Sequence, residues 1–98
     1  MNLEDVRALT LKTLSEQLGT YGFDRVEVEA GKDHDDDDAL FMTATYRAGS
    51  ALPGGDVLVK ALTKLRGDLQ KSGEERFPYL THRLEDEEAG FEDEDIRE

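Results

Sequence analysis

Residues 23–46 have the sequence FDRVEVEAGKDHDDDDALFMTATY, and two stretches of it show the two-residue period of a β-strand. Residues 23–30 alternate apolar and charged side chains, which is the pattern of a strand with one buried face. After the polar run 31–38, the alternation resumes in residues 39–46 with more apolar side chains. Two strands joined by a short local loop pair antiparallel, so this stretch predicts a β-hairpin.

Helical periodicity precedes and follows the hairpin. In residues 3–18, leucine and valine recur at spacings of three and four, with Asn2 in place to cap the first turn and Gly19 to end the last one. Residues 56–71 repeat this spacing, and Asp56 is the expected N-cap. The hairpin is therefore expected to lie between two amphipathic helices.

The C-terminal part of the chain predicts an extended link, a short helix and a tail. Residues 74–80 hold large apolar side chains around a proline, and Thr81 has the side chain of an N-cap for a short last helix. Beyond this helix the composition buries too little apolar surface to offset its ordering entropy. We expect one domain over residues 1–88 and a disordered acidic tail over residues 89–98.

Together these elements predict an α+β fold in the order α-β-β-α, an antiparallel β-hairpin flanked by two main helices, with a short C-terminal helix. Two strands alone make a marginal sheet, because three or more are usually needed for independent stability. The second strand is also apolar on both faces around Phe41. Both observations favour a homodimer in which two hairpins form a four-stranded sheet, or in which helices cover the exposed face.

The charge of the chain is concentrated in two segments. The net charge is -12, from 24 acidic and 12 basic residues. The run Asp33–Asp38 and the last fourteen residues hold most of the acids, while the rest of the chain is nearly neutral. The absence of cysteine excludes disulfides and thiolate sites, and no apolar run approaches the roughly 18 residues of a membrane span. We expect a cytoplasmic protein without membrane contact.

The aspartate run is the first candidate for site chemistry. Its alternate carboxylates match the first ligand positions of a calcium loop, and His34 adds an imidazole. However, Asp38 stands where that loop needs glycine, and Ala44 stands where it needs a bidentate glutamate. The run is therefore interpreted as a solvated hairpin loop, and no metal or cofactor is expected.

His82 lies in the only sequence cluster that resembles a polar active site, together with Arg76, Tyr79 and Arg83. A histidine titrates near neutral pH and can transfer protons. No nucleophile or carboxylate can be placed beside it from spacing, so a structural role is expected and the protein is predicted not to be an enzyme.

The aromatic residues Phe23, Phe77 and Tyr79 are interpreted as part of the core and its rim. A base-stacking platform lies among cations on a sheet face. Glu27 and Glu29 on the outward face of the first strand would instead repel a phosphate backbone. This argues against RNA binding through the sheet.

The favoured hypothesis is a small acidic interaction or regulatory module, without enzymatic activity, that docks on a larger basic protein. Charge of one sign steers a partner of the opposite sign. The residues expected to bind this partner are the acids of the tail and one apolar anchor among them: Glu85, Asp86, Glu87, Glu88, Phe91, Glu92, Asp93, Glu94 and Asp95.

The alternative is a nucleic-acid-associated protein that uses the basic stretch Lys60–Arg83, with the acidic tail as an internal competitor. Its phosphate-binding residues would be Lys60, Lys64, Lys71, Arg76 and Arg83. No helix-turn-helix or glycine-rich phosphate motif accompanies these cations, so nucleic acid is the less favoured partner. A small enzyme or metal binder is the third and weakest reading.

Overall fold

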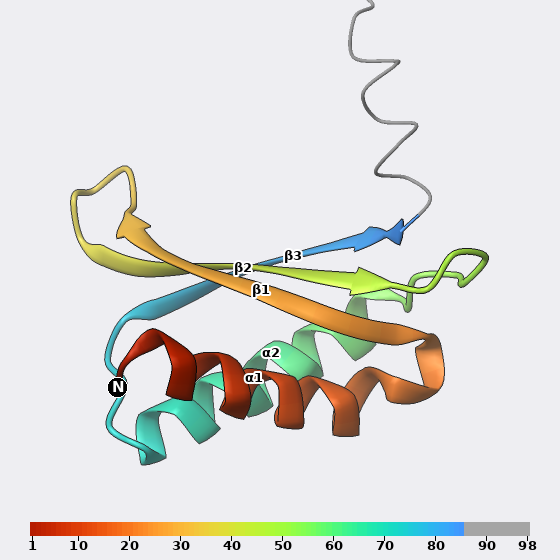
Figure 1. Cartoon of the computed structure of the whole chain (residues 1–98), viewed down its shortest axis with the longest axis horizontal. Coiled ribbons are helices and arrows are strands. Elements are labelled where there is room, and N and C mark those ends of the chain that lie inside the picture. Colours follow the sequence, from red (N-terminus) through yellow and green to blue (C-terminus); the bar gives the residue numbers. More distant parts are fainter. Residues whose placement is uncertain (86–98) are drawn as a thin grey trace, which may run out of the picture.

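The structure is a computed structural model that describes residues 1–85, in which two helices lie beneath a three-stranded sheet (Figure 1). The elements follow in the order α1 (Leu3–Leu18), the 3-10 turn η1 (Gly19–Tyr21), β1 (Phe23–Lys32), β2 (Asp38–Tyr46), α2 (Gly55–Lys71) and β3 (Phe77–Leu84). β2 is the central strand, antiparallel to β1 and parallel to β3. The α+β class and the hairpin are thus confirmed.

The predicted helices are present, with differences at their ends. Asn2 caps α1, since its Oδ1 accepts a hydrogen bond of 2.8 Å from the N–H of Asp5. The chain reverses at Gly22, which has a φ of 94°, whereas Gly19 stays right-handed and begins η1. The cap of α2 is Gly54, so the prediction for Asp56 is wrong, and that carboxylate lies in the first turn.

The predictions of an extended C-terminal link and a short last helix are wrong, because residues 77–84 form β3. The sequence FPYLTHRL alternates between the two faces of the sheet, and each residue pairs with one of β2 from Ala39↔Phe77 to Tyr46↔Leu84. Pro78 and Thr81 had indicated a helix boundary, but proline is tolerated at the beginning of an edge strand. The observed order is therefore α-β-β-α-β, with α2 as the crossover between two parallel strands.

The third strand also removes the argument for a dimer. β2 is paired along both edges by β1 and β3, so the sheet does not need a second hairpin to reach three strands. Nothing in residues 1–85 supports a four-stranded sheet shared between two copies.

The core lies between the sheet and the helix pair. One face of β2 points into it and contributes Leu40, Met42, Ala44 and Tyr46, all buried. The helices contribute side chains spaced by four or eight residues, which lie on one side of each helix, namely Val6, Leu14 and Leu18 from α1 and Ala61, Leu65 and Leu69 from α2.

Residues 86–98 lie outside the described part, and so do the predicted tail and its boundary at residue 88. Within residues 1–85, neither helix has the length and apolar character needed to cross a membrane.

Candidate docking surface

The face of the sheet that points away from α1 and α2 is called the open face here. No helix or strand of residues 1–85 lies over it (Figure 1). The strand register arranges its side chains in four rows across β1, β2 and β3: Gly31–Ala39–Phe77, Glu29–Phe41–Tyr79, Glu27–Thr43–Thr81 and Arg25–Thr45–Arg83. The first two rows adjoin the hairpin loop, and the last lies at the opposite end of the sheet.

Phe41, Tyr79 and Phe77 form an aromatic strip across the first two rows. The rings of Phe41 and Tyr79 are stacked, with centroids 5.5 Å apart and planes at 14°. Phe77 meets Tyr79 edge to face at 4.8 Å. Phe41 and Phe77 each keep 38% of their surface exposed, so the open face presents large apolar groups to its surroundings.

Gly31 allows the ring of Phe41 to pack closely against the backbone of β1. A Cβ built at this position would be 3.1 Å from Cε2 of Phe41, closer than most such contacts. Because glycine has no side chain, the Phe41 ring can cover the backbone there. A larger residue would force the ring to shift.

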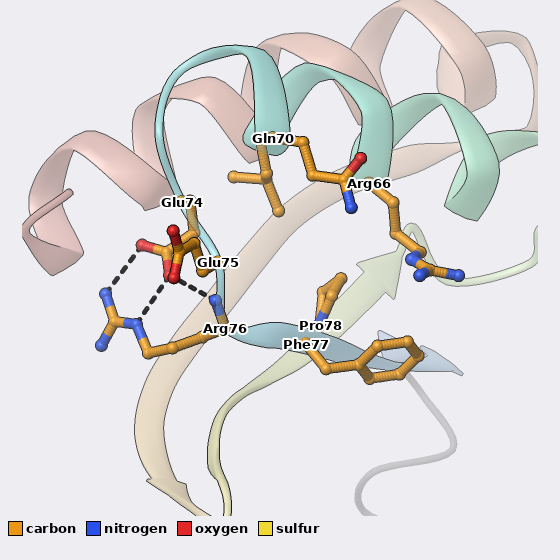
Figure 2. A pocket seen from close by; sticks show the side chains of 8 residues that line it. Arg66, Gln70, Glu74, Glu75, Arg76, Phe77 and Pro78 are labelled. Carbon is orange, nitrogen blue, oxygen red and sulfur yellow. Dashed lines mark hydrogen bonds and ion pairs between the residues drawn. The ribbon is translucent and has the colours of Figure 1, made fainter.

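A guanidinium already contacts one ring of the strip. Arg66 reaches from α2, and its Cζ lies 4.8 Å from the centroid of Phe77 (Figure 2). This distance is within the range of a cation–π interaction. The strip therefore has the chemistry to accept arginine side chains.

Two exposed carboxylates flank the strip on β1. Glu29 is directly opposite Phe41, and Glu27 is opposite Thr43. Neither glutamate forms an ion pair with any of residues 1–85. They leave negative charge available beside an exposed aromatic surface.

Asp33 fixes the hairpin loop to the same surface. Its Oδ1 accepts hydrogen bonds from the N–H groups of Asp35 and Asp37, at 2.9 and 3.1 Å. Its Oδ2 accepts one of 3.0 Å from the hydroxyl of Tyr79. These bonds lower the pKa of Asp33, and the bond from the N–H of Asp37 has the largest effect. One aspartate of the run thus organises the loop, and no group of three histidine or acidic side chains within residues 1–85 is placed to hold a metal.

The opposite end of the open face contains two arginines, Arg25 and Arg83, and adjoins Glu85. Nη1 of Arg25 lies 3.3 Å from Oδ2 of Asp24 and 3.7 Å from Oε2 of Glu85. Glu85 is the one predicted partner-binding residue within the described residues. The remaining predicted contacts, Asp86, Glu87, Glu88, Phe91, Glu92, Asp93, Glu94 and Asp95, lie beyond residue 85.

The five predicted phosphate-binding residues do not share one surface. Lys60, Lys64 and Lys71 are exposed on α2, where Lys64 is paired with Asp68 at 2.9 Å. Arg83 belongs to the open face, on the other side of the sheet from α2. The fifth, Arg76, is held by a neighbouring carboxylate.

Arg76 and Glu74 form a clamp between α2 and β3 (Figure 2). The guanidinium donates through Nε and Nη2 to the two oxygens of Glu74, and the N–H of Arg76 donates to Oε2. Nη2 also donates to the carbonyl of Met1, which ties in the start of the chain. These bonds lower the pKa of the buried Glu74 to about 2. The adjoining cavity of about 40 Å³ has room for only a few waters. We assign the clamp a structural role.

His82 is separated from its predicted partners by the alternation of β3. It points toward the helices, while Tyr79 and Arg83 point to the open face. Its Nδ1 lies 2.9 Å from the hydroxyl of the buried Tyr46. Burial raises the pKa of Tyr46 to about 12 and lowers the pKa of His82. Burial therefore favours the neutral form of both side chains, and one hydrogen bond joins them.

The interpretation of the aromatic residues needs a partial correction. Phe23 is buried in the core, as expected. Phe77 and Tyr79 instead join Phe41 on the open face, which sequence reasoning did not anticipate. The signal was the two-residue period of residues 77–84, which places every second side chain on one face.

No family model, curated protein or solved structure matches this chain.

Proposed function

We propose that this protein is a docking module, without enzymatic activity, that binds a basic protein partner through the open face of its sheet. The observation that carries this proposal is an exposed aromatic strip flanked by Glu27 and Glu29, two carboxylates that form no ion pair within residues 1–85. Aromatic residues are enriched at the centres of protein interfaces, tyrosine is common among the residues that contribute most binding energy, and charge complementarity supplies specificity.

The chemistry of the open face favours a protein over a nucleic acid. The aromatic strip could stack on bases, but Glu27, Glu29 and the aspartate run stand where a phosphate backbone would pass. Lysine and arginine side chains of a protein would instead find carboxylates and ring faces together. The acids of residues 86–98 add long-range attraction for the same kind of partner.

The test is capture of a basic protein from extracts of the source cells, compared between matched variants. Glu27→Lys/Glu29→Lys reverses the charge beside the strip, and Phe41→Ser removes its central ring. Val59→Ser is the control, because Val59 is 64% exposed on α2, far from the open face. We expect the control to retain the captured protein and both open-face variants to lose it.

The proposal also predicts a salt dependence. Attraction between exposed charges is screened within roughly 8 Å at physiological ionic strength, so capture should weaken as salt rises. Equal capture by the wild type and both open-face variants would contradict the proposal.

A further inference from the structure

Within residues 1–85, β1 pairs with β2 alone, so its outer edge, called the free edge, has unpaired backbone groups and adjoins the open face. The N–H of Asp33 donates to the carbonyl of Asp37 at 3.0 Å, which marks a hydrogen-bonded pair at the end of the hairpin. Such pairs alternate along antiparallel strands, so the register continues them at every second residue of β1. The N–H and C=O groups of Val28 and Ala30 therefore point away from β2, toward the free edge.

The protection of this edge against pairing with another strand comes from negative charge alone. Edges are commonly blocked by charged side chains, above all lysine, by proline or by a bulge. In β1 the bulge lies between Phe23 and Arg25, and the lysine is the last residue, Lys32. The stretch from Val26 to Gly31 has no proline, lysine or bulge, and its only charges are those of Glu27 and Glu29. The other edge of the sheet, along β3, contains Pro78, which has no N–H to donate.

The charges on the open face select what can pair there. A second copy of the chain would bring Glu27 and Glu29 of both molecules together, and like charges across strands are destabilising. An added strand with basic side chains would instead form opposite-charge pairs. In an antiparallel addition, both glutamates occupy non-hydrogen-bonded positions, where facing side chains come closest.

The opposite side of the edge is apolar. Val28 is half-buried and Ala30 is exposed on the side of the helices. Leu11 is 42% exposed on α1, which packs against β1. Thr13 marks the flank of α1 that faces α2, because its Oγ1 donates to Asp68. Leu11 is two residues away, so it lies on the opposite flank, below the free edge of β1.

We infer that β1 binds an extended segment of the basic partner as a fourth strand, in which lysine or arginine alternates with apolar residues. The basic side chains lie on the open face beside Glu27 and Glu29, and the apolar ones lie over Val28 and Leu11. Backbone hydrogen bonds to Val28 and Ala30 supply affinity, and the alternation supplies specificity. This inference rests on the proposed function and gives the partner a sequence pattern.

The test uses a synthetic peptide of about ten residues, the length of β1, with arginine at every second position and valine or threonine between. A peptide of the same composition with all arginines in one block is the control. We expect the full-length protein to bind the alternating peptide more tightly, by about tenfold. Hydrogen exchange should slow at the amides of Val28 and Ala30, and not at those of Glu27 and Glu29.

Three variants distinguish binding at the β1 edge from attraction by the net negative charge of the protein. Ala30→Pro removes an outward N–H, and should weaken binding about tenfold. Glu27→Gln/Glu29→Gln should weaken it about three- to tenfold. Glu16→Gln/Glu75→Gln changes the net charge equally at exposed sites off this edge, and should change affinity less than about twofold.

Equal binding of both peptides, or wild-type affinity in a folded Ala30→Pro variant, would overturn the inference. Unchanged amide exchange with bound peptide would do the same without any variant. If neither peptide binds while capture of a basic protein still depends on Phe41, the edge inference fails and the proposed function stands. If the alternating peptide binds, but the open-face variants capture as much basic protein as the wild type does, the proposed function fails.

Discussion

The two faces of the sheet are built from alternate residues of the same strands, yet they have opposite properties. On the face covered by α1 and α2, Leu40, Met42 and Tyr46 are buried with almost no exposed surface. On the open face, Phe41 lies between two of them in the sequence and keeps 38% of its surface exposed. Apolar character alone therefore does not identify the core. A large apolar residue on the uncovered face, beside two further aromatic rings, is instead a candidate for a binding contact.

The largest expected difference between the faces concerns the neighbours Leu40 and Phe41. Leu40→Ala leaves a cavity in the core and should lower the free energy of unfolding by about 3 kcal/mol. Phe41→Ala removes a half-exposed ring and one stacking contact, so we expect a loss of about 1 kcal/mol. Urea denaturation of both variants gives the comparison. A larger loss for Phe41→Ala would mean that the open face is part of the core.

The next prediction compares a buried carboxylate with an exposed one. Glu74 has its pKa lowered to about 2, so its clamp with Arg76 stabilises the fold fully above about pH 4.5. This contribution, about 2–3 kcal/mol, is lost as the pH falls from 4.5 toward 2. Urea denaturation of Glu74→Gln should show lower stability at pH 7 and a weaker pH dependence in this range. Glu29→Gln should resemble the wild type, because Glu29 forms no ion pair within residues 1–85.

A smaller difference is expected between the two histidines in their effect on the pH dependence of stability. Burial lowers the pKa of His82, so the unfolded chain takes up a proton at a higher pH than the folded protein. Stability is therefore lost as the pH falls from about 6.5 toward the folded pKa. His82→Gln should flatten the dependence of Tm on pH between 7 and 5. His34→Gln should leave it unchanged, since His34 is 86% exposed in the hairpin loop. The same slope in both variants would show that burial of His82 does not matter.

The sequence predicts the helix-covered face far better than the open face. Periodicity gives α1, α2 and the hairpin within about two residues, because burial on one side leaves a repeating pattern. It missed β3, because Thr81 and Pro78 also fit a helix start and a chain break, and only pairing with β2 decides between them. Without β3, nothing in the sequence brings Tyr79 to Phe41. The candidate site arises from this long-range parallel pairing.

The smallest effect on stability is expected from the acidic segment itself. A chain that ends at residue 85 retains both faces of the sheet and the contact of Arg25 with Glu85. Its free energy of unfolding should therefore match that of the full chain within about 0.5 kcal/mol. Binding should respond differently, because the deleted acids contribute attraction at a distance. We expect association with the basic partner to slow several-fold at low salt, with little change in dissociation. The difference should vanish at about 1 M salt, where screening acts over roughly 3 Å. Faster dissociation of the truncated protein would instead place residues 86–98 within the interface, beside the open face.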